Sequence, residues 1–238
     1  GTLAVLRDNA ELIAARAQAP LQVVHVGVRS DNHALDLSGL RISRDVFAVA
    51  RDPEVEILVE LIGGTTVARE LVEAAIVAGK HVVTANKALL ALHGEELYRA
   101  AEQAGVDVMF EAAVGGGIPI ISAVKENLGG NRFQSVFGIL NGTCNYILTR
   151  MTDEGADFAA VLADAQAKGY AEADPTFDVE GVDTAHKLAL LSSLCFGTRV
   201  DFKDIYTEGI TRITALDIEF AREFGYKFKL LAIGKRAN

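Results

Sequence analysis

A carboxylate-rich segment followed by a lysine is the part of this sequence best suited to chemistry. Residues 169–183 are dense in acids, and Asp183 and Lys187 are four positions apart on a predicted helix, so they share one face. The rest of that helix is mostly apolar, which predicts a partly buried ammonium group that nearby acids keep charged. A positioned lysine can donate a proton to a carbonyl oxygen as hydride arrives, which is worth about 10²–10⁴ in rate. The alternative is a structural ion pair on a helix surface, worth about 0.3–0.5 kcal/mol.

Two kinds of metal site, for calcium and for zinc, are excluded by the residues present. A calcium loop starting at Asp174 would place Val179 at its central glycine position and Ala185 at its terminal glutamate position. The two cysteines, Cys144 and Cys195, have no metal-ligand spacing. The acidic segment is therefore not predicted to bind calcium, and no zinc site is expected.

A run of three glycines at residues 115–117 follows Glu111 and an apolar strand-like stretch. Glycines let the backbone approach a ligand or bend sharply. Exposed carbonyls in such a turn are suitable ligands for a hard cation. The alternative is a linker that crosses from one domain to the next.

Small and polar residues follow two predicted strands at the edge where a parallel sheet binds its ligands. Gly63, Gly64 and Thr65 open one helix, where backbone amides suit a phosphate or the nicotinamide side of a dinucleotide. Lys87 follows the next strand and is placed to reach a bound ligand. The alternatives are a plain strand-to-helix turn and a surface lysine at a helix start.

The first half of the chain alternates strands and helices. We predict helices over 3–18, 46–50, 66–78 and 87–104, strands over 21–28, 55–62, 81–84 and 106–111, and a loop over 31–44. This order predicts a parallel sheet with helices on both faces.

The pattern changes after the three glycines. We predict helices over 118–128, 142–151, 157–167, 182–196 and 214–224, strands over 133–140 and 227–233, and irregular structure over 172–180. The chain is therefore predicted to be an α/β protein, with a Rossmann-type parallel-sheet domain over 1–113 and an α+β domain over 114–238.

Composition excludes several classes of function. The chain has 238 residues, ordinary globular composition and a net charge of −9, which disfavours a nucleic-acid surface. No apolar stretch is long enough to span a bilayer. The two cysteines fit a reducing, cytoplasmic compartment.

The glycine-rich dinucleotide fingerprint GxGxxG is absent, although the element order calls for it. The chain begins with Gly1 directly before a helix, so we expect the fingerprint just upstream. Arg29 closes the second predicted strand, where an arginine would hold the 2′-phosphate of NADP. Asp31 nearby leaves NAD open.

Taken together, these segments resemble the homoserine dehydrogenase family. The motifs run in the family's order and cover nearly the whole chain. They are residues 60–64 (ELIGG), 83–87 (VTANK), 111–119, 141–145 (NGTCN), and 169–175 (GYAEADP) with Asp183 and Lys187 downstream.

The resemblance implies reversible NAD(P)H-dependent reduction of L-aspartate 4-semialdehyde to L-homoserine, a step of threonine, methionine and isoleucine synthesis. It implies a homodimer formed through the second half, and a monovalent cation, Na⁺ or K⁺. Carried over by position, Lys187 and Lys87 are the catalytic lysines. The implied substrate contacts are Thr143, Glu172, Asp178 and Asp183, the implied cofactor neighbours are Lys87 and Gly169, and the implied cation ligands are Glu111, Val114, Gly116 and Ile118. From their positions after predicted strands, Arg29, Gly63, Gly64 and Thr65 are expected to contact the cofactor as well.

Two other functions remain to be separated from this one. The first is a non-catalytic binding or assembly role, which cofactor titration would reveal. The second is a semialdehyde dehydrogenase acting on an acyl phosphate, which needs a nucleophilic cysteine. Cys144 lies at a predicted helix start, but no cysteine–histidine arrangement accompanies it.

Overall fold

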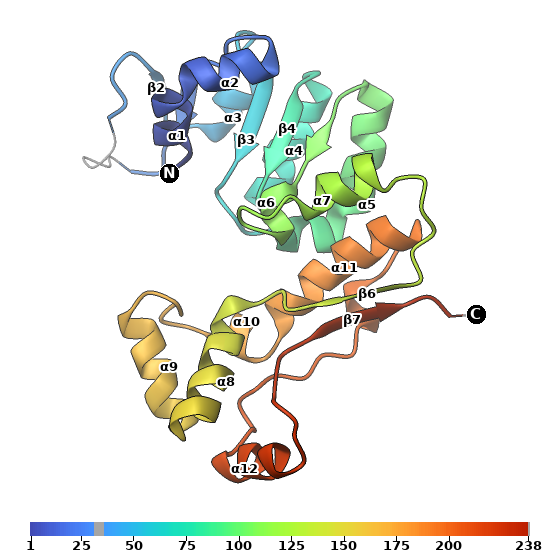
Figure 1. Ribbon diagram of the computed structural model, residues 1–238. Helices are drawn as coiled ribbons and strands as arrows, with labels where there is room; N and C mark the ends of the chain where they lie inside the picture. Colours follow the sequence, from blue (N-terminus) through green and yellow to red (C-terminus); the bar gives the residue numbers. More distant parts are fainter. Residues whose placement is uncertain (31–35, 238) are drawn as a thin grey trace. The chain divides into compact units, whose positions relative to one another are not determined.

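The computed structural model describes residues 1–30 and 36–237, which divide into two compact units (Figure 1). The first unit comprises residues 1–60, 66–83 and 96–109. The second comprises residues 61–65, 84–95 and the chain from Phe110 onward. Among the described residues, no helix is long and apolar enough to cross a membrane.

The first unit begins with two short helices where one was predicted. The predicted helix over 3–18 is divided into α1 (Thr2–Asp8) and α2 (Ala10–Ala17). Asn9 separates them with a non-helical ψ of 20°, and its side-chain amide donates to the carbonyl of Val5. An asparagine side chain competes with the helical hydrogen-bond pattern in this way, which explains the break.

A two-stranded parallel sheet follows, made of β1 (His25–Gly27) and β2 (Arg41–Ser43). β1 is shorter than the strand predicted over 21–28. β2 lies inside the segment predicted to be a loop, which is a correction. Three residues are too few to show an alternating pattern, so β2 left no signal. Asp45 then caps α3 (Val46–Arg51), accepting a hydrogen bond from the amide of Phe47 at 2.9 Å.

A three-stranded sheet, in the order β3-β4-β5, supplies the βαβ pattern. Its strands are β3 (Ile57–Glu60), β4 (His81–Thr84) and β5 (Val108–Met109), and β4 and β5 run in parallel. The connecting helices are α4 (Val67–Val77) and α5 (Lys87–Ala104), of which α5 has the predicted bounds. α4 buries Ala68, Leu71, Val72, Ala75 and Ile76, the apolar stripe of an amphipathic helix. The predicted Rossmann-type half is thus confirmed.

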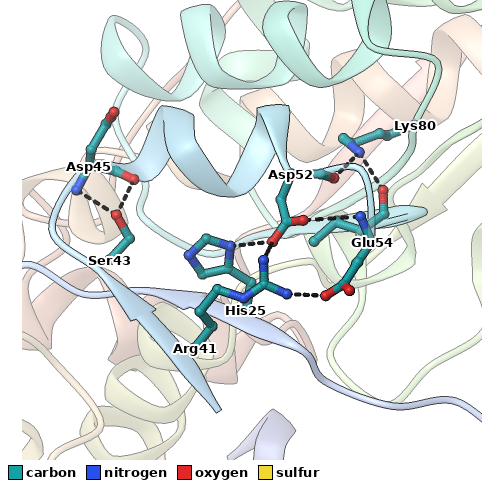
Figure 2. Close-up of polar contacts among 8 residues, drawn as sticks. His25, Arg41, Ser43, Asp45, Asp52, Glu54 and Lys80 are labelled. Atoms are coloured by element: carbon teal, nitrogen blue, oxygen red, sulfur yellow. Dashed lines mark hydrogen bonds and ion pairs between the residues drawn. The ribbon is translucent and has the colours of Figure 1, made fainter.

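A polar cluster around Asp52 ties the ends of these elements together (Figure 2). The buried Asp52 carboxylate lies 2.7 Å from Nδ1 of His25 and 2.7 Å from the Arg41 guanidinium, which also pairs with Glu54. The Lys80 ammonium donates to the Asp52 carbonyl oxygen at 2.6 Å. Asp52 therefore links β1, β2 and the turn before β3 through its side-chain carboxylate and its backbone carbonyl.

The second unit is α+β, as predicted. It contains α6 (Glu111–Val114), α7 (Ile120–Ser122), a π-helical turn (Ala123–Asn127), β6 (Ser135–Gly138), α8 (Gly142–Glu154), α9 (Phe158–Ala167), α10 (Thr176–Val179), α11 (Val182–Phe196), a 3-10 turn (Phe202–Asp204), α12 (Ala215–Glu223) and β7 (Ala232–Lys235). Figure 1 shows α8 and α9 side by side, and α11 along the β6–β7 pair.

β6 and β7 pair antiparallel, with Phe137 opposite Ile233. α11 packs on the face of this pair away from Phe137 and Ile233. The approach is so close that a Cβ at Gly234 would come within 2.7 Å of the Ser192 hydroxyl. A separate apolar core lies between α8, α9 and α12, formed by Ile147, Leu148, Met151, Val161, Ile210 and Ile218.

Several predicted bounds are wrong from residue 106 onward. The strand predicted over 106–111 ends at Met109, and Glu111 begins α6 instead. The helix predicted over 118–128 is a short α-turn followed by a π-turn. The segment predicted to be irregular contains α10, and the last strand starts at Ala232 rather than 227. The helix predicted over 182–196 is α11, which ends at Gly197 with a left-handed φ of 63°.

Candidate active site

A buried carboxylate shared by two lysines forms the centre of the site, and all its residues belong to the second unit. Asp183, in the first turn of α11, is 3% exposed. Its Oδ1 lies 2.8 Å from Nζ of Lys87, and its Oδ2 lies 2.8 Å from Nζ of Lys187. Lys187 also donates to the carbonyl of Leu140 at 2.9 Å. The predicted i,i+4 pair is therefore formed, but it is buried rather than lying on a helix surface.

Asp183 remains ionised in this setting. Burial acts to raise the pKa of Asp183, but hydrogen bonds from Lys187, Lys87 and Asn141 outweigh it, and the pKa lies below its usual value. The carboxylate is thus a fixed negative charge between two ammonium groups.

Lys87 is positioned by a helix cap. It is the first residue of α5, and the side-chain oxygen of Asn86 accepts a hydrogen bond from the amide of Leu89 at 3.1 Å. The side-chain amide of Asn86 donates to the carbonyl of Gly64 at 2.7 Å. This bond ties the start of α5 to the turn after β3, where Gly63 and Gly64 both have a φ of +74°. Only glycine adopts that conformation without strain.

A first pocket of about 540 Å³ opens beside the two lysines. It is lined by Lys87, Asn141, Gly142, Thr143, Tyr146, Tyr170, Asp178, Asp183 and Lys187. The Thr143 hydroxyl donates to the carbonyl of Tyr170 at 2.8 Å, which links α8 to the acidic segment. Five predicted catalytic and substrate residues, Lys87, Lys187, Thr143, Asp178 and Asp183, therefore line one pocket.

A second pocket of about 340 Å³ shares Lys87, Asp178 and Asp183 with the first. Glu172 and Gly63, both predicted from the sequence, line it together with Asn86, Asp174 and Phe177. The turn after β3 and the acidic segment thus meet at one cavity. A Cβ at Gly63 would meet nothing within 4 Å, so open space adjoins this backbone, as a cofactor at this turn would require.

The remaining predicted cofactor residues are not among those that line the two pockets. Gly64, Thr65 and Gly169 line neither, and Gly169 ends the turn after α9 with a φ of +74°. Arg29 is an exposed residue of the first unit, and its carbonyl accepts a hydrogen bond from Arg44. Asp31 lies outside the described residues.

Two of the predicted cation ligands, Glu111 and Ile118, accept backbone hydrogen bonds in the structure. The two carboxylate oxygens of Glu111 accept hydrogen bonds from the amides of Ile121 at 2.7 Å and Ser122 at 2.9 Å, so Glu111 caps α7. The carbonyl of Ile118 accepts from the amide of Ile120, while Val114 is buried and Gly116 exposed. The donor set is a carboxylate and carbonyl oxygens, which suits a hard cation. Among the described residues, no three His, Cys, Asp or Glu side chains gather around a potential metal site.

Asn141 and His186 are among the residues to which the sequence assigned no role. Asn141, the N-cap of α8, donates to Asp178 at 2.7 Å and to Asp183 at 3.0 Å. His186 is buried between the rings of Phe177 and Phe202, and its Nδ1 has no hydrogen-bond partner among the described residues. Burial lowers the pKa of His186, as does the nearby charge of Lys87. The signals for Asn141 were its helix-capping residue type and its place at the start of the 141–145 motif.

Cys144 is unsuited to nucleophilic catalysis. Burial and the nearby carboxylates of Asp178, Asp183 and Glu180 raise the pKa of its thiol to about 12. The thiol donates to the carbonyl of Asp178 at 3.0 Å. The acyl-phosphate alternative, which requires a thiolate, is therefore disfavoured.

Known proteins resemble the whole chain. A family model described as the NAD-binding domain of homoserine dehydrogenase matches residues 1–111, and one described as homoserine dehydrogenase matches residues 119–237. The homoserine dehydrogenase of Pseudomonas aeruginosa is 52% identical over 100% of this chain and 55% of its own length. The homoserine dehydrogenase of Synechocystis is 51% identical over 98% of this chain and 54% of its own length. The chain thus spans about half the length of these curated relatives.

Solved structures agree with the sequence comparison. The crystal structure of a homoserine dehydrogenase from Thiobacillus denitrificans has a TM-score of 0.96 and 54% identity, over 100% of this chain and 55% of that one. A hyperthermophilic archaeal homoserine dehydrogenase in complex with NADPH has a TM-score of 0.78 and 25% identity, over 97% of this chain and 75% of that one. On the family models and this identity, the chain belongs to the homoserine dehydrogenase family.

Proposed function

We propose that the protein catalyses reversible NAD(P)H-dependent reduction of L-aspartate 4-semialdehyde to L-homoserine, in the pathway to threonine, methionine and isoleucine. The observation that carries this proposal is the Lys87–Asp183–Lys187 cluster at the wall of the first pocket. The nicotinamide supplies the hydride when bound. The chain's own residues bind the zwitterionic aldehyde, orient it and provide the proton.

Lys187 is the proton donor in this scheme. An ammonium group has three N–H donors, and Asp183 and the Leu140 carbonyl accept two of those of Lys187. The third is available to the substrate's carbonyl oxygen, where negative charge develops as hydride is transferred. Lys87, partly exposed and bonded to the other Asp183 oxygen, adds positive charge at the same place.

The acidic residues suit the other end of the substrate. Glu172, which lines the second pocket, would bind the substrate's ammonium group, and Asp183 would contact its hydroxyl end. Thr143 and Asp178 support these contacts from the first pocket. A cluster of carboxylates around a cationic group is stabilising where water is partly excluded.

We propose NADP, or else NAD, as the cofactor. The positive-φ turn at Gly63 and Gly64, followed by Thr65, would approach the nicotinamide side, and Lys87 and Gly169 would also contact the cofactor. Arg29 would hold the 2′-phosphate, which favours NADP, and the relative described with NADPH supports the same preference. Replacing Arg29 with Ala should weaken the binding of NADPH more than that of NADH. The ratio of the KM values for the two cofactors measures this difference.

We also propose a Na⁺ or K⁺ ion at Glu111 with the carbonyls of Val114, Gly116 and Ile118. The ion would brace the backbone at the start of α7 and take no part in the proton transfer. The thermal unfolding temperature should rise on adding Na⁺ or K⁺, and Glu111→Ala should abolish the rise.

A homodimer formed through the second unit is our proposal for the assembly. Phe137 and Ile233 lie opposite each other on the outer face of the β6–β7 pair, and they are 77% and 52% exposed. Such an apolar pair favours burial against another copy. Replacing Phe137 with Asp should shift the protein toward the monomer in analytical ultracentrifugation.

The activity is tested with the intact protein, aspartate semialdehyde and NADPH or NADH. Loss of reduced-cofactor absorbance that depends on the aldehyde, with homoserine as the product, is the expected result. Cofactor binding without turnover would instead favour the non-catalytic binding role.

A further inference from the structure

Asn141 joins the two carboxylates of the site through one side chain. It lies between β6 and α8, it is 4% exposed, and it lines the first pocket. Its side-chain amide donates to Oδ1 of Asp178 at 2.7 Å and to Oδ2 of Asp183 at 3.0 Å. Both donors of the amide are therefore used, each on a different acid.

The orientation of this amide is set by its partners. The side-chain oxygen of Asn141 accepts a hydrogen bond from the amide of Cys144 at 2.8 Å, which caps α8. Rotating the side chain by half a turn would aim that oxygen at two carboxylates and the NH₂ group at a backbone donor. The helix start thus fixes the direction in which Asn141 donates.

The same turn also holds the lysine. The carbonyl of Leu140 accepts a hydrogen bond from Lys187, while Asn141 donates to the Asp183 oxygen that Lys187 contacts. Two consecutive residues therefore hold both members of the ion pair. A displacement of about 1 Å at a reacting group can cost about 10²-fold in rate, so this restraint has a catalytic consequence.

We propose that Asn141 is a positioning residue, which keeps Asp178 and Asp183 apart and in place so that Asp183 orients the Lys87 and Lys187 ammonium groups. The proposal rests on the proposed function for its kinetic test, but its structural content is independent of the substrate. A neutral donor is required here, because a third carboxylate would repel the other two.

Two substitutions separate the role of Asn141 as the cap of α8 from its proposed role in positioning Asp178 and Asp183. Asn141→Ser keeps an oxygen that caps α8 but replaces the two N–H donors of the amide with a single O–H on a shorter side chain, and Asn141→Asp keeps size and cap but adds a like charge. We expect kcat/KM to fall about 10²-fold in both, mainly through kcat. In Asn141→Asp, the acid limb of the pH profile should also move to higher pH, because repulsion raises the pKa values of the acids.

Asn145 provides a matched control on the same helix. It is also a buried asparagine, and it holds the backbone of Leu230 from both sides, at 3.1 and 3.2 Å. Asn145→Ser should lower the free energy of unfolding but leave the pH profile unchanged. If Asn145→Ser and Asn141→Ser change stability and kinetics alike, Asn141 has only a structural role and the proposal is wrong.

A second readout does not depend on turnover. The carboxyl-carbon NMR shifts of Asp178 and Asp183 are titrated in the wild-type protein and in Asn141→Ser. The proposal expects the pKa of Asp183 to rise when the donation is lost, and an unchanged pKa in a folded variant overturns it. Absence of wild-type activity with a shifted Asp183 titration would reject the proposed function while keeping Asn141 as the restraint.

Discussion

Two buried aspartates, one in each unit, bind cations in similar ways and differ in their surroundings. Asp52 accepts from His25, Arg41 and the amide of Glu54, whereas Asp183 accepts from Lys87, Lys187 and Asn141. Hydrogen bonding to the Glu54 amide, together with His25 and Arg41, lowers the pKa of Asp52 despite its burial. Both carboxylates are therefore charged, and each of their oxygens has a partner.

The difference lies in what the partners adjoin. Asp183 and its two lysines line the first pocket, whereas Asp52 lines neither of the two pockets described above. Lysine carries its charge on a compact group with three donors, which leaves one available for a ligand, whereas the guanidinium of Arg41 divides its donors between Asp52 and Glu54. A buried ion cluster thus indicates structure by itself, and a function only when it adjoins a cavity.

Removing one cation from each cluster should give the largest contrast. Lys187→Ala should lower kcat by about 10²–10⁴-fold, because the proposed proton donor is lost. Arg41→Ala should keep kcat within error and lower the unfolding midpoint. Steady-state kinetics and urea denaturation of both variants test this contrast, and normal turnover of a folded Lys187→Ala protein would contradict the assigned role.

Neutralising each aspartate is the second contrast. Asp183→Asn leaves two ammonium groups without their counter-ion, and the expected loss of stability is about 3 kcal/mol, at the low end for a buried pair because Lys87 is 35% exposed. The same variant should be nearly inactive. Asp52→Asn should destabilise the protein while kcat stays unchanged in the folded fraction, and equal activity losses would remove the distinction.

The pH dependence of stability should also reflect the surroundings of Asp183, because the neighbouring His186 is buried. Burial and Lys87 lower the pKa of His186 in the folded protein, while Asp183 acts in the opposite direction. The unfolded chain takes up a proton below about pH 6.5, and the folded chain does so only at lower pH. The contribution of His186 to stability is therefore lost as pH falls below 6.5. His186→Phe should flatten this part of the stability curve, measured by denaturant melts, and an unchanged slope would contradict it.

The smallest effect is expected at Cys144. Its high pKa leaves it protonated at neutral pH, and serine preserves a donor to the Asp178 carbonyl. Cys144→Ser should retain kcat, and iodoacetamide should leave the folded wild-type enzyme active. Inactivation by the reagent at Cys144 would revive the acyl-phosphate alternative.

Sequence patterns identified the parts of the molecule that have strong periodicity or a clear residue signal at their ends. α5 and α11 have their predicted bounds because long amphipathic or apolar runs end at Gly105 and Gly197, which adopt left-handed conformations. The spacing of Asp183 and Lys187 predicted their ion pair. β2 and α10, at three and four residues, are too short for either periodicity to be seen.

The rest of the site depends on contacts between distant parts of the sequence. Lys87 contacts Asp183 across 96 positions of the chain, and no local sequence pattern around either residue predicts that contact. Asn141 is a common capping residue, so its link to Asp178 and Asp183 becomes visible only when α8, α10 and α11 are assembled. The family resemblance supplied the Lys87 assignment that physical patterns left open.

Burial along α11 has a consequence for local opening of the second unit. Ten of its fifteen residues are buried, and it packs against α6, α10, β6 and β7. Amides in such a segment exchange with solvent deuterium only when much of the surrounding structure opens. We therefore expect α11 to be among the slowest-exchanging segments of its unit. Its first two turns would then present Asp183 and Lys187 as a rigid wall, to which incoming molecules must adapt.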